Sequence, residues 1–166
     1  MNDVRVVVTG LEWMGSGIRS IESAVDEMFQ QVQDEVLISA YSVGNTSERI
    51  FGRLEDVLAR GVRVHMVVNR LGAQPDAVIK ALKALGKRYP YFHLYSFEST
   101  EEMADLHAKT IVVDRKTALV GSANISYRGW TTNHELALLV TGEAVRVIAG
   151  VLGNLLSSTH CKKVTD

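Results

Sequence analysis

Short apolar segments of β-strand length alternate with amphipathic helical segments from residue 4 to residue 97, and this alternation limits the fold more than any other feature. The strands expected from apolar, β-branched composition span 4–9, 35–41, 62–69 and 91–97, and the helices between them span 18–33, 46–60 and 75–88. Thr46 is expected to cap the second helix and Pro75 to open the third. Parallel strands need such helical crossovers. The pattern therefore predicts an α/β fold with a mixed, largely parallel β-sheet flanked by helices on both faces.

The last third of the sequence departs from this alternation. Two strands, 106–113 and 117–120, are joined by a tight turn, and a strand over 135–140 and a closing helix over 143–157 follow. No linker or low-complexity segment interrupts the sequence, so residues 1–166 are expected to form a single domain.

Composition limits the partners and the compartment. A net charge of −1 gives no general attraction to nucleic acid or to an anionic membrane, so a polyanion would need local clusters of cations. The N-terminal segment lacks the pattern of a secretory signal, and no apolar stretch approaches the ~18 residues that span a bilayer. The single cysteine, Cys161, excludes an internal disulfide and a cysteine-rich zinc site. We therefore expect a cytoplasmic protein without stable membrane association.

The segment from Leu106 to Asp114 carries the residues with the clearest chemical meaning. Side chains alternate between the two faces of a strand, so His107 and Lys109 are expected to share one face. Asp114 lies five residues beyond Lys109, about 16 Å along an extended strand. It is therefore expected to hold the turn with its side chain rather than to reach a substrate.

The turn between the two strands sets the cross-strand neighbours of this pair. A two-residue turn over 115–116 puts Ser122 opposite Lys109 and Asn124 opposite His107. One surface then presents an imidazole, an ammonium, a hydroxyl and a carboxamide, which can supply a nucleophile, a cation and neutral donors to a phosphoryl group. A register slip of one residue would break this arrangement.

The spacing His107-x-Lys109-x4-Asp114-x6-Gly121-Ser122-x-Asn124 resembles the full signature of the phospholipase D superfamily, and Asn133-His134-Glu135 resembles its Asn-x-Glu segment. The match is close over roughly residues 105–140 and looser over 39–69. The resemblance implies a phospholipase D-like fold and catalytic domain. It implies as catalytic residues His107, Lys109, Ser122, Asn124 and Glu135, and as structural residues of the motif Asp114, Gly121 and Asn133.

The resemblance also implies a mechanism. One histidine attacks phosphorus and forms a covalent phosphohistidine, a second protonates the leaving oxygen, and water releases the intermediate. Histidine suits both steps because its unperturbed pKa is about 6.5. Lys109, Ser122 and Asn124 would bind the phosphoryl oxygens, and Glu135 would orient a histidine. Neither a metal nor another cofactor is required.

This mechanism needs two histidines, whereas the sequence contains one usable motif. His65 and His93 lack the following lysine and are expected to be core or edge residues, and His160-Cys161-Lys162 is not followed by Gly-Ser-x-Asn. Either two copies share a site at a two-fold axis between their His107 residues, or the chain pairs with a different motif-bearing protein. The homodimer is favoured, because this chain resembles the short single-motif branch of the family, in which two copies share a site. The members of that branch are largely nucleases.

Several cations and aromatic side chains are candidate contacts to nucleic acid. One group, Lys80, Lys83 and Lys87, shares a face of the helix over 75–88, which fits a phosphate-binding stripe but is also typical of an ordinary solvated face. Tyr127 and Trp130 are expected either to stack on bases or to pack at a subunit interface. The further candidate cations are Arg70, Arg115, Lys116 and Arg128.

The sequence thus predicts a metal-independent phosphodiesterase, first of all a homodimeric endonuclease that cleaves DNA or RNA. A phospholipid-processing enzyme is one alternative, but no apolar lip, anchor or basic amphipathic helix is evident. A partner-dependent subunit of a defence assembly is another. The acidic residues before His107 fit a nuclease least well, because they oppose the approach of a polyanion or gate the site; they are Glu98, Glu101, Glu102 and Asp105.

Overall fold

The computed structural model describes residues 1–15, 17–44, 48–99 and 104–165. Its strands are β1 (Asp3–Thr9), β2 (Arg19–Ser20), β3 (Glu35–Ala40), β4 (Arg63–Asn69), β5 (Phe92–Phe97), β6 (Lys109–Val113), β7 (Thr117–Gly121), β8 (Glu135–Thr141) and β9 (Cys161–Lys163). Its helices are α1 (Ile21–Gln31), α2 (Glu48–Ala59), the 3-10 turn η1 (Leu71–Ala73), α3 (Asp76–Arg88), α4 (Tyr127–Thr131) and α5 (Glu143–Leu156).

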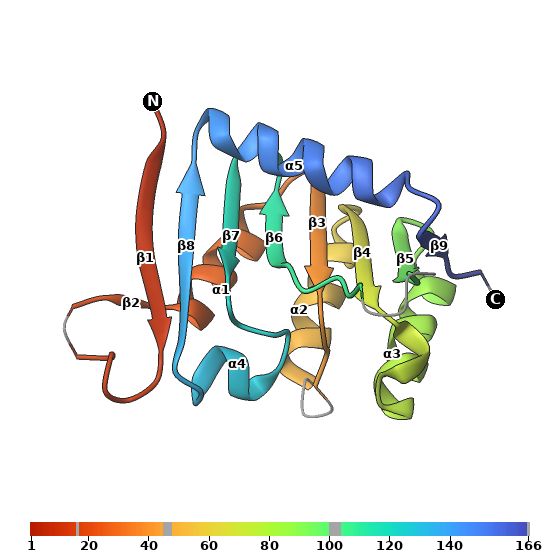
Figure 1. Cartoon of the computed structure of the whole chain (residues 1–166), viewed down its shortest axis with the longest axis horizontal. Coiled ribbons are helices and arrows are strands. Elements are labelled where there is room, and N and C mark those ends of the chain that lie inside the picture. The colour runs from red at the N-terminus through yellow and green to blue at the C-terminus, as the bar shows by residue number, and fades with distance from the viewer. Residues whose placement is uncertain (16, 45–47, 100–103, 166) are drawn as a thin grey trace.

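Within the described ranges, nine strands form one sheet in the order β2-β1-β8-β7-β6-β3-β4-β5-β9 (Figure 1). β3, β4 and β5 are parallel neighbours, as the helical crossovers predicted, and β1 pairs in parallel with the short β2. The other neighbouring pairs are antiparallel. The mixed α/β fold is therefore confirmed, but the sheet is not largely parallel. The antiparallel meander β6-β7-β8 inserts between β1 and β3, and a strand–helix alternation confined to residues 4–97 could not indicate this.

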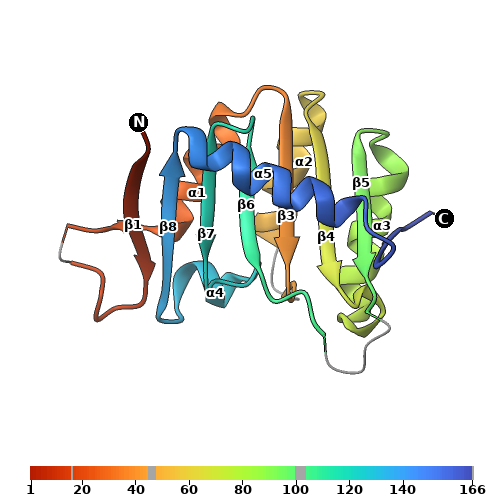
Figure 2. The same cartoon turned by 45° about the horizontal axis from the view of Figure 1, so that its top comes forward.

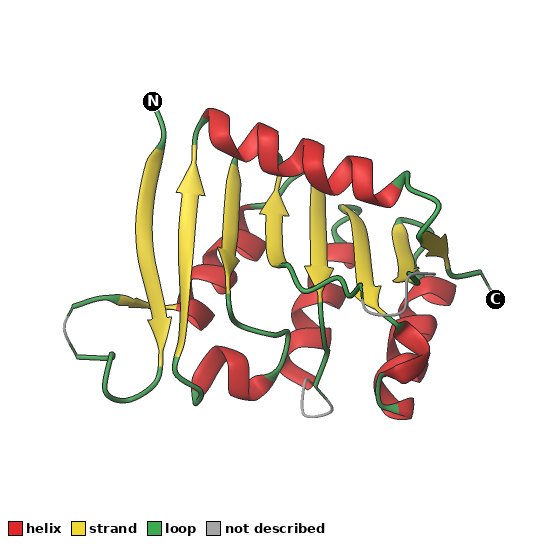
Figure 3. Cartoon of the chain, in the orientation of Figure 1, coloured by secondary structure: helices red, strands yellow, loops and turns green. Residues whose placement is uncertain are grey.

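Helices cover both faces of the sheet, as predicted. α1 to α4 lie against one face, and α5 crosses the other (Figure 2, Figure 3). Successive side chains of β3 point to opposite faces of the sheet. Val36 and Ile38 therefore pack in the large core under α1 to α4, whereas Leu37 packs in the smaller core under α5. Each such buried side chain stabilises the fold by about 1.5–3 kcal/mol. Among the described helices, none is both long and apolar enough to cross a membrane.

Most predicted elements lie within two residues of their expected bounds. α1 begins late, at Ile21, because the Ser20 side chain caps it by accepting a 3.1 Å hydrogen bond from the Ser23 N–H. Pro75 directly precedes α3, as expected. The predicted Thr46 cap of α2 lies outside the described residues.

Four short elements were not predicted, namely β2, η1, α4 and β9. Each has five residues or fewer, so none displays a full period of apolar residues. β9 is the outer neighbour of β5, and it contains Cys161 and Lys162 of the second His-x-Lys sequence. That sequence therefore lies at the far edge of the sheet, separated from β6 by β3, β4 and β5.

Candidate active site

Four strand ends meet at one edge of the sheet, the lower edge in Figure 1. β6 and β8 begin there, at Lys109 and Glu135, and β3 and β7 end there, at Ala40 and Gly121. The order β8-β7-β6-β3 is antiparallel throughout, so alternate beginnings and ends of strands lie side by side. The motif residues before β6, after β7 and at the start of β8 therefore gather at this edge.

His107 and Lys109 are in direct contact at this edge. The Lys109 ammonium nitrogen lies 3.2 Å from Nδ1 of the His107 ring and donates a 2.8 Å hydrogen bond to the His107 carbonyl oxygen. The expected strand over 106–113 begins only at Lys109, so His107 lies in the irregular segment before it. Strand alternation therefore does not explain the pair. The contact arises because the lysine side chain folds back onto the backbone and ring of His107.

Tyr41, the residue after β3, flanks this pair. The centroid of its ring lies 4.6 Å from that of His107 and 5.2 Å from the Lys109 ammonium nitrogen. A cation near an aromatic ring at such a distance is stabilised by roughly 0.5–2 kcal/mol. Tyr41 was not predicted as a site residue, because the pairing of β3 with β6 that brings it here is not visible in the sequence. Its sequence signals are its place at the end of a buried strand and within the segment 39–69, which resembles the family only loosely.

Glu135 organises the other half of the edge. Its carboxylate accepts hydrogen bonds from the Ser122 hydroxyl and, at 3.3 Å, from the Asn133 side-chain amide. Ser122 is also fixed by the backbone of Leu136, whose N–H donates to its hydroxyl oxygen at 3.2 Å. Within the described part of one chain, the hydrogen-bond partners of Glu135 do not include His107, so its predicted role in orienting a histidine stays a prediction.

Electrostatics connects the two halves of this edge. Burial lowers the pKa of Lys109, and the negative charge of Glu135 opposes that change. The carboxylate thus favours the charged form of the lysine. The edge presents an exposed imidazole, a half-buried cation and an oriented hydroxyl, which together can bind and attack a phosphoryl group.

The β6–β7 register differs from the predicted one by one residue. Lys109 pairs with Gly121 rather than with Ser122, because the turn holds three residues, 114–116, instead of two. Residues 114 and 115 adopt left-handed conformations with φ of 51° and 53°, which closes this turn and was not foreseen for non-glycine residues. Ser122 consequently joins the site from beyond the end of β7, through its contact with Glu135.

Gly121 occupies a position where β7 and β8 approach closely. A Cβ atom there would lie 2.4 Å from the Ala137 Cβ and 2.5 Å from the Leu136 carbonyl oxygen. Both distances are far below van der Waals contact, so a side chain would push the two strands apart at the edge that carries Ser122 and Glu135.

Asn124 lies in the turn after β7. The one-residue change of register removes its predicted position opposite His107. Its side-chain oxygen is buried and has no hydrogen-bond partner among the described residues. Binding of a phosphoryl oxygen by Asn124 stays a prediction.

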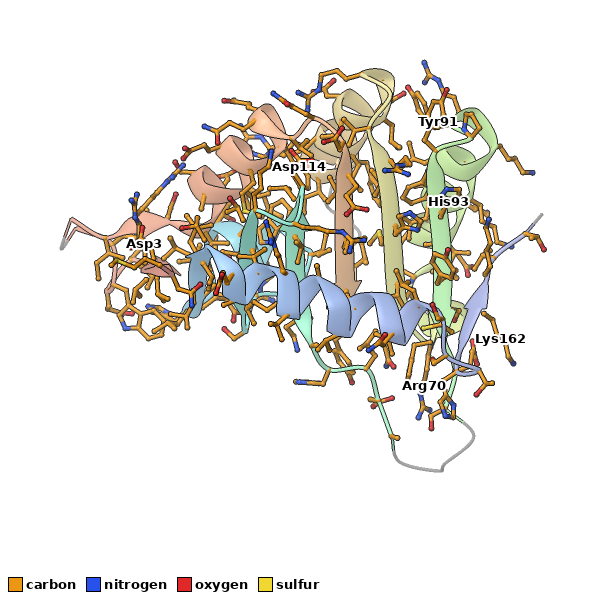
Figure 4. The ribbon with its side chains drawn as sticks, turned by 90° about the horizontal axis from the view of Figure 1, so that it is seen from above. Asp3, Arg70, Tyr91, His93, Asp114 and Lys162 are labelled. Atoms are coloured by element: carbon orange, nitrogen blue, oxygen red, sulfur yellow. The ribbon has the colours of Figure 1, made fainter. Side chains whose placement is uncertain are left out.

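Asp114 lies at the other end of β6 from Lys109, next to the start of β3 (Figure 4). Its carboxylate accepts hydrogen bonds from the backbone N–H groups of residues 33–35, at 2.8–3.0 Å. The motif aspartate is thus placed away from the edge that holds His107.

Most candidate nucleic-acid contacts lie on other parts of the molecule. Arg115, at the hairpin tip, forms an ion pair with Glu35 at 2.5 Å. The remaining exposed candidates are Lys80, Lys83 and Lys87 on α3, Lys116 at the hairpin tip, and Tyr127 and Arg128 on α4. Their contact with nucleic acid stays a prediction. Of the acidic residues before His107, Glu98 accepts a hydrogen bond from Ser96, whereas Glu101 and Glu102 lie outside the described residues.

Trp130 corrects both interpretations made for it. Its side chain is 3% exposed and belongs to the large core, with the Arg53 guanidinium 5.8 Å from its ring. It is therefore unavailable in this chain for stacking on a base or for packing against a partner. The physical reason is that the short helix α4 packs against α1 and buries this residue. The five residues of α4 are too few to show such packing in the sequence.

The other histidines lie away from His107. His65 and His93 are register partners on β4 and β5, half-buried, with ring centroids 4.7 Å apart. This arrangement fits the expected core or edge positions. Burial lowers the pKa of both rings, and for His65 the neighbouring His93 adds to that effect.

Comparisons with known proteins agree with the motif. The family model described as cardiolipin synthase, PLD-like domain, matches residues 25–151. The chain is 32% identical over 148 residues to the DISARM protein DrmC of Bacillus paralicheniformis, covering 89% of this chain and 60% of that protein. It is 28% identical over 127 residues to cardiolipin synthase C of Escherichia coli, covering 66% of this chain and 26% of that protein. The chain therefore spans less than two thirds of the length of these curated relatives.

The fold is also similar to a solved structure, that of Nuc from Salmonella typhimurium, described as a phospholipase D family member. The TM-score is 0.76 and the identity 20%, with all of both chains covered. At this identity the likeness shows the fold alone. The family model spans most of the chain and contains the whole segment from His107 to Glu135. The chain belongs to the phospholipase D-like family.

Proposed function

We propose that this protein is a metal-independent phosphodiesterase that acts as a homodimeric endonuclease. The observation that carries the proposal is the direct contact of His107 with Lys109, at an edge that also holds Glu135 and Ser122. A nucleophile next to a cation and an oriented hydroxyl is the arrangement that attack on a phosphodiester needs. This arrangement is assembled by the fold and does not depend on the predicted register.

The proposed reaction uses two imidazoles. A ring nitrogen of His107 attacks phosphorus, an N–P bond forms, and the P–O bond to the leaving group breaks. His107 of the partner subunit donates a proton to the leaving oxygen. It then takes a proton from the water that attacks the phosphohistidine, so that a new P–O bond forms, the N–P bond breaks and His107 is released. Lys109, Ser122 and Asn124 would bind the non-bridging oxygens as their charge develops.

An exposed apolar sheet surface, made by Val4, Val6, Leu136 and Leu138, supports pairing with a second copy. Val6 and Leu138 are register partners on β1 and β8, so their side chains share a face, and 45% and 38% of their surface is exposed. The surface adjoins the site, because Leu136 follows Glu135 and hydrogen-bonds Ser122. A two-fold axis next to this surface would bring one His107 from each subunit together.

Nucleic acid is favoured over lipid as the substrate. The lysines on α3 are exposed and would form a stripe that binds the phosphates of nucleic acid. Cys161 is a free thiol, which would suit a cytoplasmic enzyme. A phospholipid-processing activity is kept as the alternative.

The test is a cleavage assay in excess EDTA. Wild-type protein and His107→Ala are incubated with single-stranded DNA, double-stranded DNA, RNA and phospholipid vesicles over a range of salt and pH. We expect cleavage of nucleic acid by wild type alone. Release of lipid headgroup that His107→Ala abolishes would favour the alternative, and no cleavage of any substrate would count against the enzyme proposal.

A second candidate function is that of a subunit that becomes active only with another protein. It is favoured by the similarity to a protein named as a DISARM protein, of which this chain covers 60%. Sedimentation and activity measurements separate the two candidates. A monomer that is inactive alone and active with a partner supports the second candidate, whereas an active dimer of this chain alone supports the first.

A further inference from the structure

We infer that Asn69, at the end of β4, is a positioning residue that holds the backbone carrying His107. This inference rests on the proposed function for its catalytic meaning, because His107 is the nucleophile only if the chain cleaves phosphodiesters. Asn69 fixes a segment that the sheet leaves free. His107 is exposed and precedes the first residue of β6, so the sheet ladder does not fix its position.

Both polar atoms of the Asn69 side chain are used to hold this segment. The side-chain oxygen accepts a 2.9 Å hydrogen bond from the N–H of Leu106, the residue directly before His107. The side-chain nitrogen donates a 3.1 Å hydrogen bond to the carboxylate of Asp105. Asn69 is 4% exposed, and its bond to Leu106 is buried while its bond to Asp105 is partly buried. Leaving the Asn69 amide unpaired there would therefore be costly.

Arg70 supports the same segment through the same carboxylate oxygen of Asp105 that Asn69 contacts. Its guanidinium lies 2.9 Å from the Asp105 carboxylate, and its backbone is left-handed, with φ of 42°. A non-glycine residue in that conformation is strained. The strained turn allows consecutive residues, Asn69 and Arg70, to reach one carboxylate from the end of a single strand.

Gln74 extends this arrangement to the ring that flanks His107. Its side-chain nitrogen donates to the backbone oxygen of Asn69 at 2.9 Å and to that of Tyr41 at 3.3 Å. Hydrogen bonds from the end of β4 and the residues after it therefore hold both neighbours of His107, namely the backbone of Leu106 and the residue that carries the Tyr41 ring. A misplacement of the nucleophile by about 1 Å can cost on the order of 100-fold in rate, so this fixation matters for catalysis.

We call the hydrogen bonds of Asn69 to Leu106 and Asp105 the clamp. The decisive variants change which groups donate and accept in the clamp while keeping the shape of the side chains. Asn69→Asp still accepts from the Leu106 N–H but faces Asp105 with a second carboxylate. The double change Asn69→Asp with Asp105→Asn restores an amide–carboxylate pair with the donor on the other residue. Asp114→Asn is the matched control, because it weakens side-chain hydrogen bonds to the backbone at the far end of β6 without touching this segment.

Kinetics are measured with bis(p-nitrophenyl) phosphate in EDTA. We expect Asn69→Asp to lower kcat by roughly 10- to 100-fold with KM changed by less than about threefold. The double variant should recover most of the loss, and Asp114→Asn should leave kcat near wild type despite a comparable fall in melting temperature. An Asn69→Asp enzyme with wild-type kcat, or a double variant no better than the single one, would overturn the inference.

A second measurement does not depend on activity. In protein with 13C-labelled histidine, which has five histidines, the His107 ring signal is identified by its loss in His107→Ala. We expect this signal to shift or broaden in Asn69→Asp and to stay unchanged in Asp114→Asn. An unchanged His107 signal in Asn69→Asp contradicts the positioning role even if wild type cleaves nothing. A wild type without cleavage, by contrast, contradicts the proposed function and leaves this spectrum to decide the clamp.

Discussion

The carboxylate of Asp114 accepts a 2.8 Å hydrogen bond from the backbone N–H of Asp34, at the end of the sheet opposite the candidate active site. The N–H groups of Gln33 and Glu35 donate to the same carboxylate at 2.9 Å and 3.0 Å. The aspartate of the family signature therefore joins the β6–β7 hairpin to the segment that leads into β3.

We predict that Asp114→Asn lowers the free energy of unfolding by about 1–3 kcal/mol at pH 7, because it replaces a charged acceptor of three backbone hydrogen bonds by a neutral amide. Cleavage per folded molecule should stay near wild type. Urea denaturation and an activity assay on the same samples check both parts. A large loss of kcat in a variant that is still folded would show that Asp114 acts in the chemistry.

The pH dependence of this difference follows from the direction of the pKa change. Burial by itself would raise the pKa of Asp114, but the backbone hydrogen bonds from residues 33–35 outweigh it and the pKa is lowered. A lowered folded-state pKa gives stability that is present above the unfolded value of about 3.9 and is lost as pH falls through the folded value. The gap between wild type and Asp114→Asn should therefore shrink in acid below about pH 4. A gap that stays constant down to pH 2 would contradict this account.

Substitution of Trp130 should destabilise the fold, whereas substitution of Tyr127 should leave its stability nearly unchanged. Trp130 is 3% exposed and Tyr127 is 44% exposed, although both belong to α4. Trp130→Ala should cost about 3–5 kcal/mol of unfolding free energy, because it leaves a cavity in the large core. Tyr127→Ala should change stability by less than about 0.5 kcal/mol. Thermal or urea unfolding of the two variants checks the contrast, and equal losses would contradict the described burial.

His65 and His93 should make the fold acid-sensitive. Burial lowers the pKa of both rings, so their contribution to stability is present above the unfolded pKa of about 6.5 and is lost as pH falls through the folded values. We expect wild type to lose more unfolding free energy than His93→Phe between pH 7.5 and pH 5. Urea titrations at the two pH values measure this. Equal losses in the two proteins would show that the pair does not titrate with unfolding.

The alkaline limit of activity should depend on Glu135. Burial lowers the pKa of Lys109 and the charge of Glu135 opposes it, so Glu135→Gln should lower that pKa further. The alkaline limb of kcat/KM against pH is then expected to move to lower pH, in addition to a general loss of roughly 10- to 1,000-fold. Ser122→Ala, which removes a partner of Glu135 but no charge, is the control. An alkaline limb that moves equally in both variants would contradict the electrostatic link.

Much of this fold and part of the site could be predicted from the sequence. Periodicity located nearly all the longer elements, and the motif singled out His107, Lys109 and Glu135, which the fold then gathers at one edge. The hairpin register could not be predicted, because it depends on whether residue 114 adopts a left-handed conformation, and that depends on the hydrogen bonds Asp114 makes with a segment about 80 residues away.

Tertiary packing accounts for the other differences. The order of strands places β6 beside β3, and only this order brings Tyr41 to His107. The burial of Trp130 is likewise decided by the docking of α4 on α1, and the pattern of five residues carries no such information. Asn69 gave no sequence signal, since its partners, Asp105 and Leu106, follow a different strand.

Mixing of subunits tests whether two copies of His107 share one site. If nucleophile and acid come from different chains, a dimer with one His107→Ala subunit lacks one of the two groups and is inactive. Wild type and His107→Ala are unfolded in urea, mixed in equal amounts and refolded together. Random pairing then leaves about one quarter of the activity of the same total amount of wild type, because only that share of dimers carries two intact subunits. Chains that act singly would leave about one half. His93→Phe subunits, which change a remote histidine, should cause no comparable loss when mixed in the same way.

Leu138→Glu tests the surface through which the two copies would pair. A charge in the exposed apolar sheet surface should convert the dimer to monomers, as measured by sedimentation, and should abolish activity at the same time. A Leu138→Glu protein that sediments as a fully active monomer would exclude the shared site.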